Sequence, residues 1–209
     1  RELLIDDNPA LAGLEGLSGI GGDVEQVLVS RNDSLDSLVG LQEISAADRL
    51  DIRGNHALVD LEGLHGFTSV SGDLYVIDND NLANLDALSG VTGHVGEILV
   101  TGNGLLVDVG GLSAVTSVQW LTINSNDVLP DCEVCDLLGQ LAEDPNELTV
   151  EGNAPDECTP VPDNCDSEIC PDYTGDDPCC WTHNPCEWEL NDICDCDSTC
   201  AWDAVDCEW

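Results

Sequence analysis

The chain is almost without basic residues. Among its 209 residues there are four arginines and no lysine, against 43 Asp and Glu, so the formal net charge is −39. Nucleic acids and anionic membrane surfaces bind to basic faces, and the charge therefore argues against both as partners. The mutual repulsion of so many carboxylates also opposes a compact state, and divalent cations or high salt would relieve it.

Long apolar runs and methionine are also missing. No stretch of eighteen apolar residues occurs, which predicts that no segment is inserted in a membrane. Methionine is absent even from position 1, which indicates a processed or trimmed product. The twelve cysteines are even in number and clustered, a pattern typical of disulfides formed in an oxidising compartment. We therefore expect an extracellular or cell-surface protein.

A short unit that ends in asparagine recurs seven times along the first three quarters of the chain. Successive asparagines of the repeat are 24, 23, 24, 24, 23 and 27 residues apart. A period in this range predicts a solenoid, in which each repeat forms one coil. The asparagines are Asn8, Asn32, Asn55, Asn79, Asn103, Asn126 and Asn153.

Two apolar residues, spaced two apart, open each unit. This alternation places both side chains on one face of a short strand, and seven such strands stacked at ~4.8 Å form a parallel sheet roughly 30 Å long. The inward pairs begin at Leu3, Val27, Leu50, Leu74, Ile98, Leu121 and Leu148. The residues between the members of each pair should face outward to solvent, namely Leu4, Leu28, Asp51, Tyr75, Leu99, Thr122 and Thr149.

After each asparagine, apolar residues recur at every third position, as in Leu58, Leu61, Leu64 and Phe67. This period fits neither an α-helix nor a regular strand, and it predicts a return path of 3₁₀ or polyproline-like turns. Glycine-containing sequences at 21–23, 71–73 and 96–97 predict a second sharp turn before several strands.

The recurrent asparagine should point inward at the corner where each strand ends. There its amide can satisfy backbone groups that lack partners in the sheet, and amides of successive coils can form a ladder. A ligand-binding role is the alternative, but a residue found at the same place in every coil serves the repeat. For the same reason the glycosylation sequence Asn32-Asp33-Ser34 is a poor acceptor.

The runs Ser71-Gly72-Asp73-Leu74-Tyr75-Val76-Ile77-Asp78-Asn79 and Leu58-Val59-Asp60-Leu61-Glu62-Gly63-Leu64 resemble the receptor L domain, a leucine-rich-repeat relative, in the form found in secreted bacterial proteins. The resemblance covers roughly residues 1–157. It implies an all-β fold, a right-handed parallel β-solenoid of about seven coils. Receptor L domains include ligand-binding modules, but the matching positions are structural, so no ligand-contacting residue can be carried over.

The two ends of the solenoid differ. In the last coil, Cys132 and Cys135 take inward places, and a short helix is predicted over 137–143. Pairing of these cysteines with Cys158 and Cys165, in an order that the sequence leaves open, would close the end. A Cys-x-x-Cys redox or zinc site is the alternative. The first strand starts at Leu3 without a cap, which predicts either end-to-end docking into an open filament or the edge of a fragment.

These patterns divide the chain into a capped solenoid over 1–165 and a cysteine-rich module over 166–209. The module has eight cysteines and few aliphatic residues, so disulfides or metal must hold it together. Its segment 191–207 resembles a Notch-type (LNR) repeat, although Asp192 and Ala204 stand where glycine is usual. The resemblance implies one calcium ion, since calcium takes six to eight oxygen ligands. Solvated acidic turns are the alternative. The implied ligands are Asn191, Asp195, Asp203 and Asp206.

No established catalytic motif occurs: there is no Gly-x-Ser-x-Gly, phosphate loop or His-Glu-x-x-His. A carboxylate pair could hydrolyse polysaccharide, but only Arg31 and Arg53 offer a basic pair on neighbouring coils. We therefore predict a non-catalytic extracellular structural or adhesive surface protein, whose partner is a protein, itself included as a homopolymer assembled end to end with calcium support. The alternative is a recognition module that binds a glycan or protein on the face of the sheet.

Overall fold

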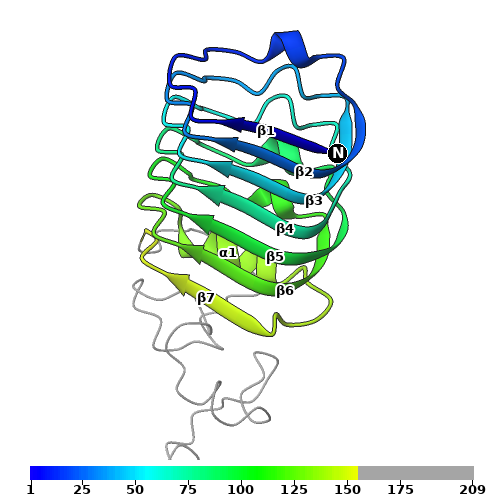
Figure 1. The fold of residues 1–209 in the computed structure, drawn as a ribbon. Helices are drawn as coiled ribbons and strands as arrows, with labels where there is room; N and C mark the ends of the chain where they lie inside the picture. The colour runs from blue at the N-terminus through cyan, green and yellow to red at the C-terminus, as the bar shows by residue number, and fades with distance from the viewer. Residues whose placement is uncertain (155–209) are drawn as a thin grey trace, which may run out of the picture.

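The computed structural model describes residues 1–154, and these form one seven-stranded parallel sheet with the strands in chain order (Figure 1). This arrangement confirms the all-β, parallel solenoid with one strand per coil. The cysteine-rich module at 166–209 lies outside the described residues. The strands are β1 (Glu2–Asp6), β2 (Gly22–Ser30), β3 (Ile44–Arg53), β4 (Ser69–Ile77), β5 (Gly93–Thr101), β6 (Val115–Asn124) and β7 (Glu147–Glu151).

The register of the sheet aligns the inward apolar pairs across all seven coils. Leu50, for example, pairs with Val27 on one side and Leu74 on the other. Inward residues of the central coils are fully buried, whereas Leu3 and Leu148, in the first and last strands, are only partly buried. Side chains two apart in a strand share one face, so the alternation in the sequence was sufficient to assign the inside of the sheet.

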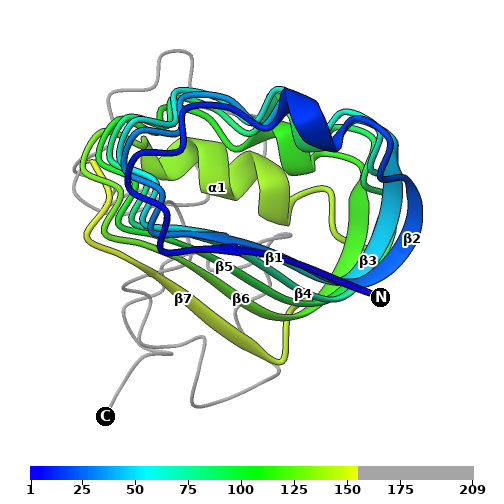
Figure 2. The same ribbon diagram turned by 45° about the horizontal axis from the view of Figure 1, so that its top comes forward.

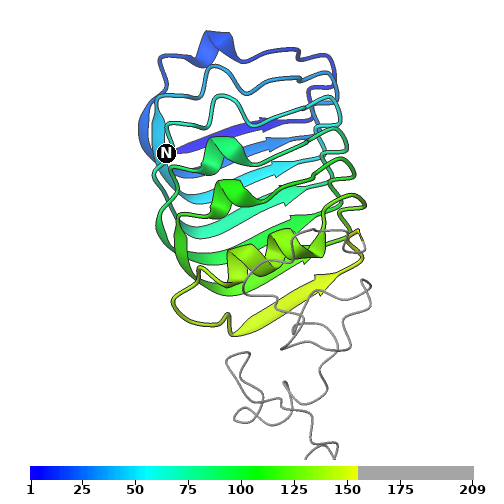
Figure 3. The ribbon, with the colours of Figure 1, turned by 180° about the vertical axis from the view of Figure 1, so that it is seen from behind.

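The return path consists of short turns, as the three-residue period predicts. Three of them are single turns of 3₁₀ helix: η1 (Glu15–Leu17), η2 (Asp86–Leu88) and η3 (Gly110–Leu112) (Figure 3). Every third side chain points into the coil, and Leu38 and Leu41 are among those that are fully buried. A 3₁₀ turn repeats every three residues, which is the reason for this spacing.

The sharp turns predicted at 71–73 and 96–97 are wrong, because β4 and β5 run through these positions. The turn predicted at 21–23 coincides with the start of β2, where Gly22 has a φ of 78° and the register with β3 shifts. Most strands have nine or ten residues and curve, so the sheet continues around the corner (Figure 2). The glycine serves close packing instead: a Cβ atom on Gly72 would lie 2.7 Å from the carbonyl oxygen of Asp48 in the coil before. Nearby, the register between β3 and β4 shifts at 47–49, which is how the strands bend without ending.

The helix of the last coil begins earlier than predicted. α1 spans Asp131–Leu138 rather than 137–143, and it replaces the 3₁₀ turn on the return path (Figures 1 and 3). Pro130 directly precedes it, where a missing N–H costs nothing, and the chain leaves the helix at Gly139. Cys132 and Cys135 are buried because they lie on the inner side of this helix. Their predicted partners, Cys158 and Cys165, lie outside the described residues.

Candidate functional site

Each strand ends in a corner of one design. The residue before each repeated asparagine has left-handed backbone geometry, with φ between 53° and 70°, and this conformation turns the chain sharply. The next side chain, the asparagine, is thereby directed into the coil. The corner residues are Asp7, Arg31, Gly54, Asp78, Gly102, Ser125 and Gly152.

The asparagines form the predicted ladder. The backbone N–H of Asn79 donates to Oδ1 of Asn103 at 3.1 Å, while its Nδ2 donates to the carbonyl oxygen of Ile52 at 3.0 Å and to the same Oδ1 at 3.3 Å. Its own Oδ1 accepts the equivalent bonds from Asn55. Asn32 is likewise fully buried, so its amide is not presented for glycosylation. These amides satisfy one another, which identifies the ladder as structural.

Charged and aromatic side chains lie on the outer face of the sheet. Side chains two residues apart share a face, so the middle row of outward residues is flanked by one row on each side. The first flanking row is Glu2, Gln26, Arg49, Asp73, Glu97, Trp120 and Glu147. The second is Asp6, Ser30, Arg53, Ile77, Thr101, Asn124 and Glu151.

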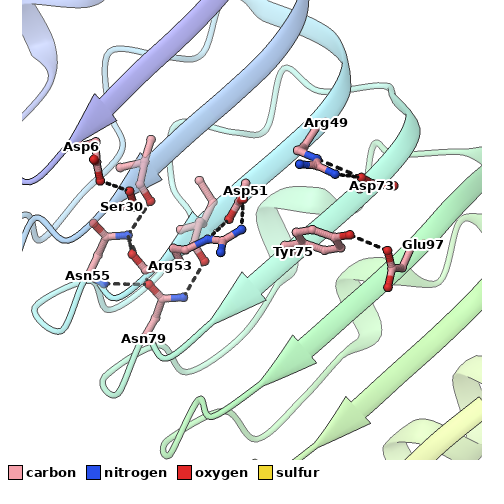
Figure 4. Close-up of polar contacts among 12 residues, drawn as sticks. Asp6, Ser30, Arg49, Asp51, Arg53, Asn55, Asp73, Tyr75, Asn79 and Glu97 are labelled. Carbon is pink, nitrogen blue, oxygen red and sulfur yellow. Dashed lines mark hydrogen bonds and ion pairs between the residues drawn. The ribbon is translucent and has the colours of Figure 1, made fainter.

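Six residues at the centre of this face form what we term the outer-face cluster: Arg49, Asp51, Arg53, Asp73, Tyr75 and Glu97 (Figure 4). Nε of Arg49 lies 2.9 Å from Oδ2 of Asp73, and its Nη2 bonds the same oxygen. Arg53 binds Asp51 through two parallel bonds, Nε to Oδ1 at 2.6 Å and Nη2 to Oδ2. Both guanidinium groups are therefore held in defined orientations.

Tyr75 lies between the two arginines. The Cζ atoms of Arg49 and Arg53 are 5.2 and 6.0 Å from the centre of its ring, within the range of cation–π attraction. Its hydroxyl donates a hydrogen bond to Oε2 of Glu97 on the neighbouring strand. Burial raises the pKa of Tyr75 to about 12, helped by the bond to Glu97 and the charge of Asp73, so the phenol keeps its proton at neutral pH.

The hydrogen bonds to the carboxylates also raise the pKa of the two arginines. The bond to Asp73 raises the pKa of Arg49, and the bond to Asp51 raises that of Arg53, each against an opposing effect of burial. At neutral pH the cluster thus contains two cations held against carboxylates and one neutral phenol. Trp120 follows Glu97 in the same row and is 42% exposed, which adds an accessible indole beside the cluster.

Part of this site was not predicted from the sequence, and one of its residues was placed wrongly. Arg49 and Trp120 lie outside the middle row of outward residues, although their positions two residues before an outward residue were a usable signal. Asp51 was expected to face solvent, yet its side chain is only 3% exposed, because Arg53 from the next outward position binds it. The structure pairs Arg31 with Asp6 at 2.6 Å, so Arg31 and Arg53 contact carboxylates rather than forming a basic pair.

His56 lies at an asparagine corner, with Nδ1 2.9 Å from Oδ2 of Asp80 on the next coil. Between residues 1 and 154, no group of three or more His, Cys, Asp or Glu side chains is placed to hold a metal ion. The implied calcium ligands lie outside the described residues, and calcium at this position stays a prediction. They are Asn191, Asp195, Asp203 and Asp206.

Comparison with known proteins gives no relative: no family model, no curated protein and no solved structure matches the chain. The resemblance to receptor L domains and to the Notch-type repeat therefore stays a prediction. Within the described part of the chain, none of the helices has the length and apolar character needed to cross a membrane.

Proposed function

We propose that this chain is a non-catalytic extracellular recognition module that binds its ligand on the outer face of the sheet. The observation that carries the proposal is the placement of Arg49, Arg53, Tyr75 and Trp120 together on that face. Arginine, tyrosine and tryptophan are the residue types that dominate the energy of binding interfaces. Here they occupy one surface of a chain that has only four arginines and five tryptophans.

The charge distribution supports the same face. The chain carries 43 acidic residues, so most of its surface repels anions. A neutral partner would meet a dense layer of hydrated carboxylates on that surface. Two of the four arginines lie on the outer face of a single strand, β3. Each is already oriented by a carboxylate, and such preorganisation lowers the entropy lost when a ligand binds.

The same contacts support a non-catalytic role. The carboxylates of Asp51 and Asp73 bind arginines, and Glu97 accepts a bond from a phenol. General acid–base chemistry calls for a group within reach of the substrate and a pKa near the working pH, and histidine is the usual choice. Three histidines lie in the described part of the chain. His56 and His65 are in the loop after β3 and His94 is near the start of β5, and none of them belongs to the outer-face rows.

An array of immobilised extracellular polysaccharides and matrix proteins tests the proposal. The labelled full-length chain is compared with Trp120→Ala, which removes an exposed side chain of the outer face, and with Val59→Ala, which removes one from the return path. We expect the parent and Val59→Ala to bind the same surfaces and Trp120→Ala to bind them about tenfold more weakly. No binding by the parent, or equal binding by all three, would overturn the proposal.

End-to-end assembly is a second candidate, because each coil of the solenoid stacks on the next through the same parallel strand pairing and the same asparagine ladder. In that ladder, Oδ1 of Asn55 accepts two hydrogen bonds from Asn32 of the coil before. A second copy that continued this stacking would extend the sheet from one chain to the next.

Light scattering and negative-stain microscopy of the purified chain test this second candidate. Filaments would establish assembly, and their loss in EDTA with recovery in calcium would show that calcium supports it. A monomer both in calcium and in EDTA would reject assembly and leave recognition by the outer face as the function.

A further inference from the structure

The outer-face cluster keeps unused hydrogen-bonding groups of both kinds. Nη1 of Arg49 and Nη1 of Arg53 donate to no other residue in the described part of the chain, and both side chains are about two-fifths exposed. On the acceptor side, Oδ1 of Asp73 and Oε1 of Glu97 likewise bind no described residue. Donors and acceptors therefore lie interspersed around the ring of Tyr75.

We infer that the ligand of this face is a neutral oligosaccharide; the inference rests on the proposed function and names its ligand class. A sugar hydroxyl is both a donor and an acceptor, so a row of hydroxyls matches a surface on which guanidinium N–H groups alternate with carboxylate oxygens. The two ion pairs stay intact when such a ligand binds, because it uses only the atoms that the pairs leave unbound.

Charged ligands fit less well. An anionic ligand that bound the unused Nη1 atoms would lie close to the carboxylates of Asp51 and Asp73, which repel it. A cationic ligand that bound Oδ1 of Asp73 would likewise lie close to the guanidinium group of Arg49. In either case the charge of the ligand meets a like charge in the cluster, which a neutral ligand avoids.

Trp120 supplies the apolar part of the proposed site. Its indole is exposed and lies one strand beyond Glu97 in the same row of the face. The faces of sugar rings carry C–H groups, which pack on aromatic rings, while the indole N–H is a further donor for a hydroxyl. From β3 to β6 the cluster and Trp120 span about 15 Å at the usual strand spacing, a length that suits an extended chain of a few sugar units.

The size of the face also favours a small ligand. Seven strands at ~4.8 Å and a straight portion of about five residues give an area of roughly 30 by 15 Å. This is about half of the ~800 Å² per partner that stable protein complexes bury. A protein partner would need additional surface beyond the three rows, whereas an oligosaccharide would be accommodated within them.

Isothermal titration of the full-length chain with cellohexaose, xylohexaose, mannohexaose and laminarihexaose tests the inference, with polygalacturonate and polylysine as charged probes. We expect at least one neutral hexasaccharide to bind, Trp120→Ala to weaken that binding about tenfold, and Val59→Ala to leave it unchanged. Arg49→Gln, which keeps a donor but breaks the ion pair with Asp73, provides a second variant of the site. Thermal unfolding of each variant confirms that it is folded.

Salt separates the ligand classes. Binding of a neutral sugar should change little between about 0.05 and 0.5 M NaCl, whereas binding of a charged polymer should fall steeply as screening increases. Binding of polygalacturonate or polylysine that depends on Trp120, without binding of any neutral hexasaccharide, would overturn the inference and leave the proposed function standing. If no probe bound in a manner that depends on Trp120 and the array also showed no binding, the inference and the proposed function would both be rejected.

Discussion

Asp51 and Arg53 bind each other along a single strand, on the face of the sheet that points to solvent. Nε of Arg53 lies 2.6 Å from Oδ1 of Asp51, and a second bond joins Nη2 to Oδ2. The carboxylate is buried at 3% exposure, while the arginine side chain that covers it is 40% exposed. Asp51 is therefore buried and ion-paired although it stands at an outward position of the strand.

This pair makes Asp51 a stabilising residue. Asp51→Ala should lower the free energy of unfolding by about 1–3 kcal/mol, since it removes two hydrogen bonds to a charged group. The loss should stay below the 3–5 kcal/mol typical of breaking a fully buried pair, because Arg53 can turn towards water. Urea unfolding measures it, with Asp36→Ala as the exposed control, expected within about 0.5 kcal/mol of the parent. Equal effects of the two substitutions would contradict the buried pair.

The asparagine ladder should be the most sensitive polar element. Asn79→Ala removes a buried amide that bonds the coil before and the coil after, and it leaves the carbonyl of Ile52 and the backbone N–H of Asn55 unpaired. We expect a loss of about 2–4 kcal/mol in urea unfolding. Asn81→Ala, which removes an exposed amide bonded to the carbonyl of His56, is the matched control and should cost less than about 1 kcal/mol. A loss as small as that of the control would show that the ladder is not stabilising.

Close stacking of the return path depends on Gly63. Its φ is +111°, and a Cβ atom there would lie 2.2 Å from the carbonyl oxygen of Leu38. Gly63→Ala should therefore destabilise the solenoid by more than about 3 kcal/mol, or prevent it from folding. Gly16 in η1 has open space at the same point, so Gly16→Ala should be neutral or stabilising by up to about 1 kcal/mol. Thermal unfolding compares the pair, and similar melting temperatures would argue against this packing.

Tyr75 should be sensitive to alkaline pH. Its pKa in the folded state is about 12, against about 10 in an unfolded chain, so the folded state holds the proton more tightly. The stability that follows is fully present below about pH 10 and is lost as pH rises towards 12. The difference between parent and Tyr75→Phe in absorbance at the tyrosinate band should show this late titration. The melting temperature of the parent should also fall relative to that of Tyr75→Phe over this range. A titration near pH 10 in the folded protein would contradict the partial burial of Tyr75 and its hydrogen bond to Glu97.

Glu133 on α1 should destabilise the fold at neutral pH. Burial, together with the charges of Asp108 and Asp136, raises the pKa of Glu133, so the folded state disfavours its ionised form. Stability is lost as pH rises above the ordinary glutamate value of about 4.3. Glu133→Gln should therefore raise the melting temperature at pH 7, and the gain should vanish near pH 3.5, where the parent is also neutral. A gain that is independent of pH would show that packing, rather than charge, is responsible.

The sequence was sufficient where a short-range rule repeats. The alternation of apolar residues identified the inner face of all seven strands, the three-residue period identified the return path, and Asn79 and its equivalents were correctly placed in a ladder. These features depend on the geometry of neighbouring residues. Because they recur in each coil, one misleading residue does not obscure the pattern.

Where the decisive partner lies in another coil, the sequence was not sufficient. The sequence around Gly72 predicted a turn, because nothing local shows that the backbone of Asp48 packs against this glycine. The outer-face cluster was missed because Arg49, Tyr75 and Glu97 are about two dozen residues apart and meet only through the register of the sheet. The sequence by itself determined the repeat, its inner face and its ladder, since these follow from local periodicity. Only the tertiary structure decided which outward side chains meet across strands, because stacking sets the register that brings distant residues within a few ångströms.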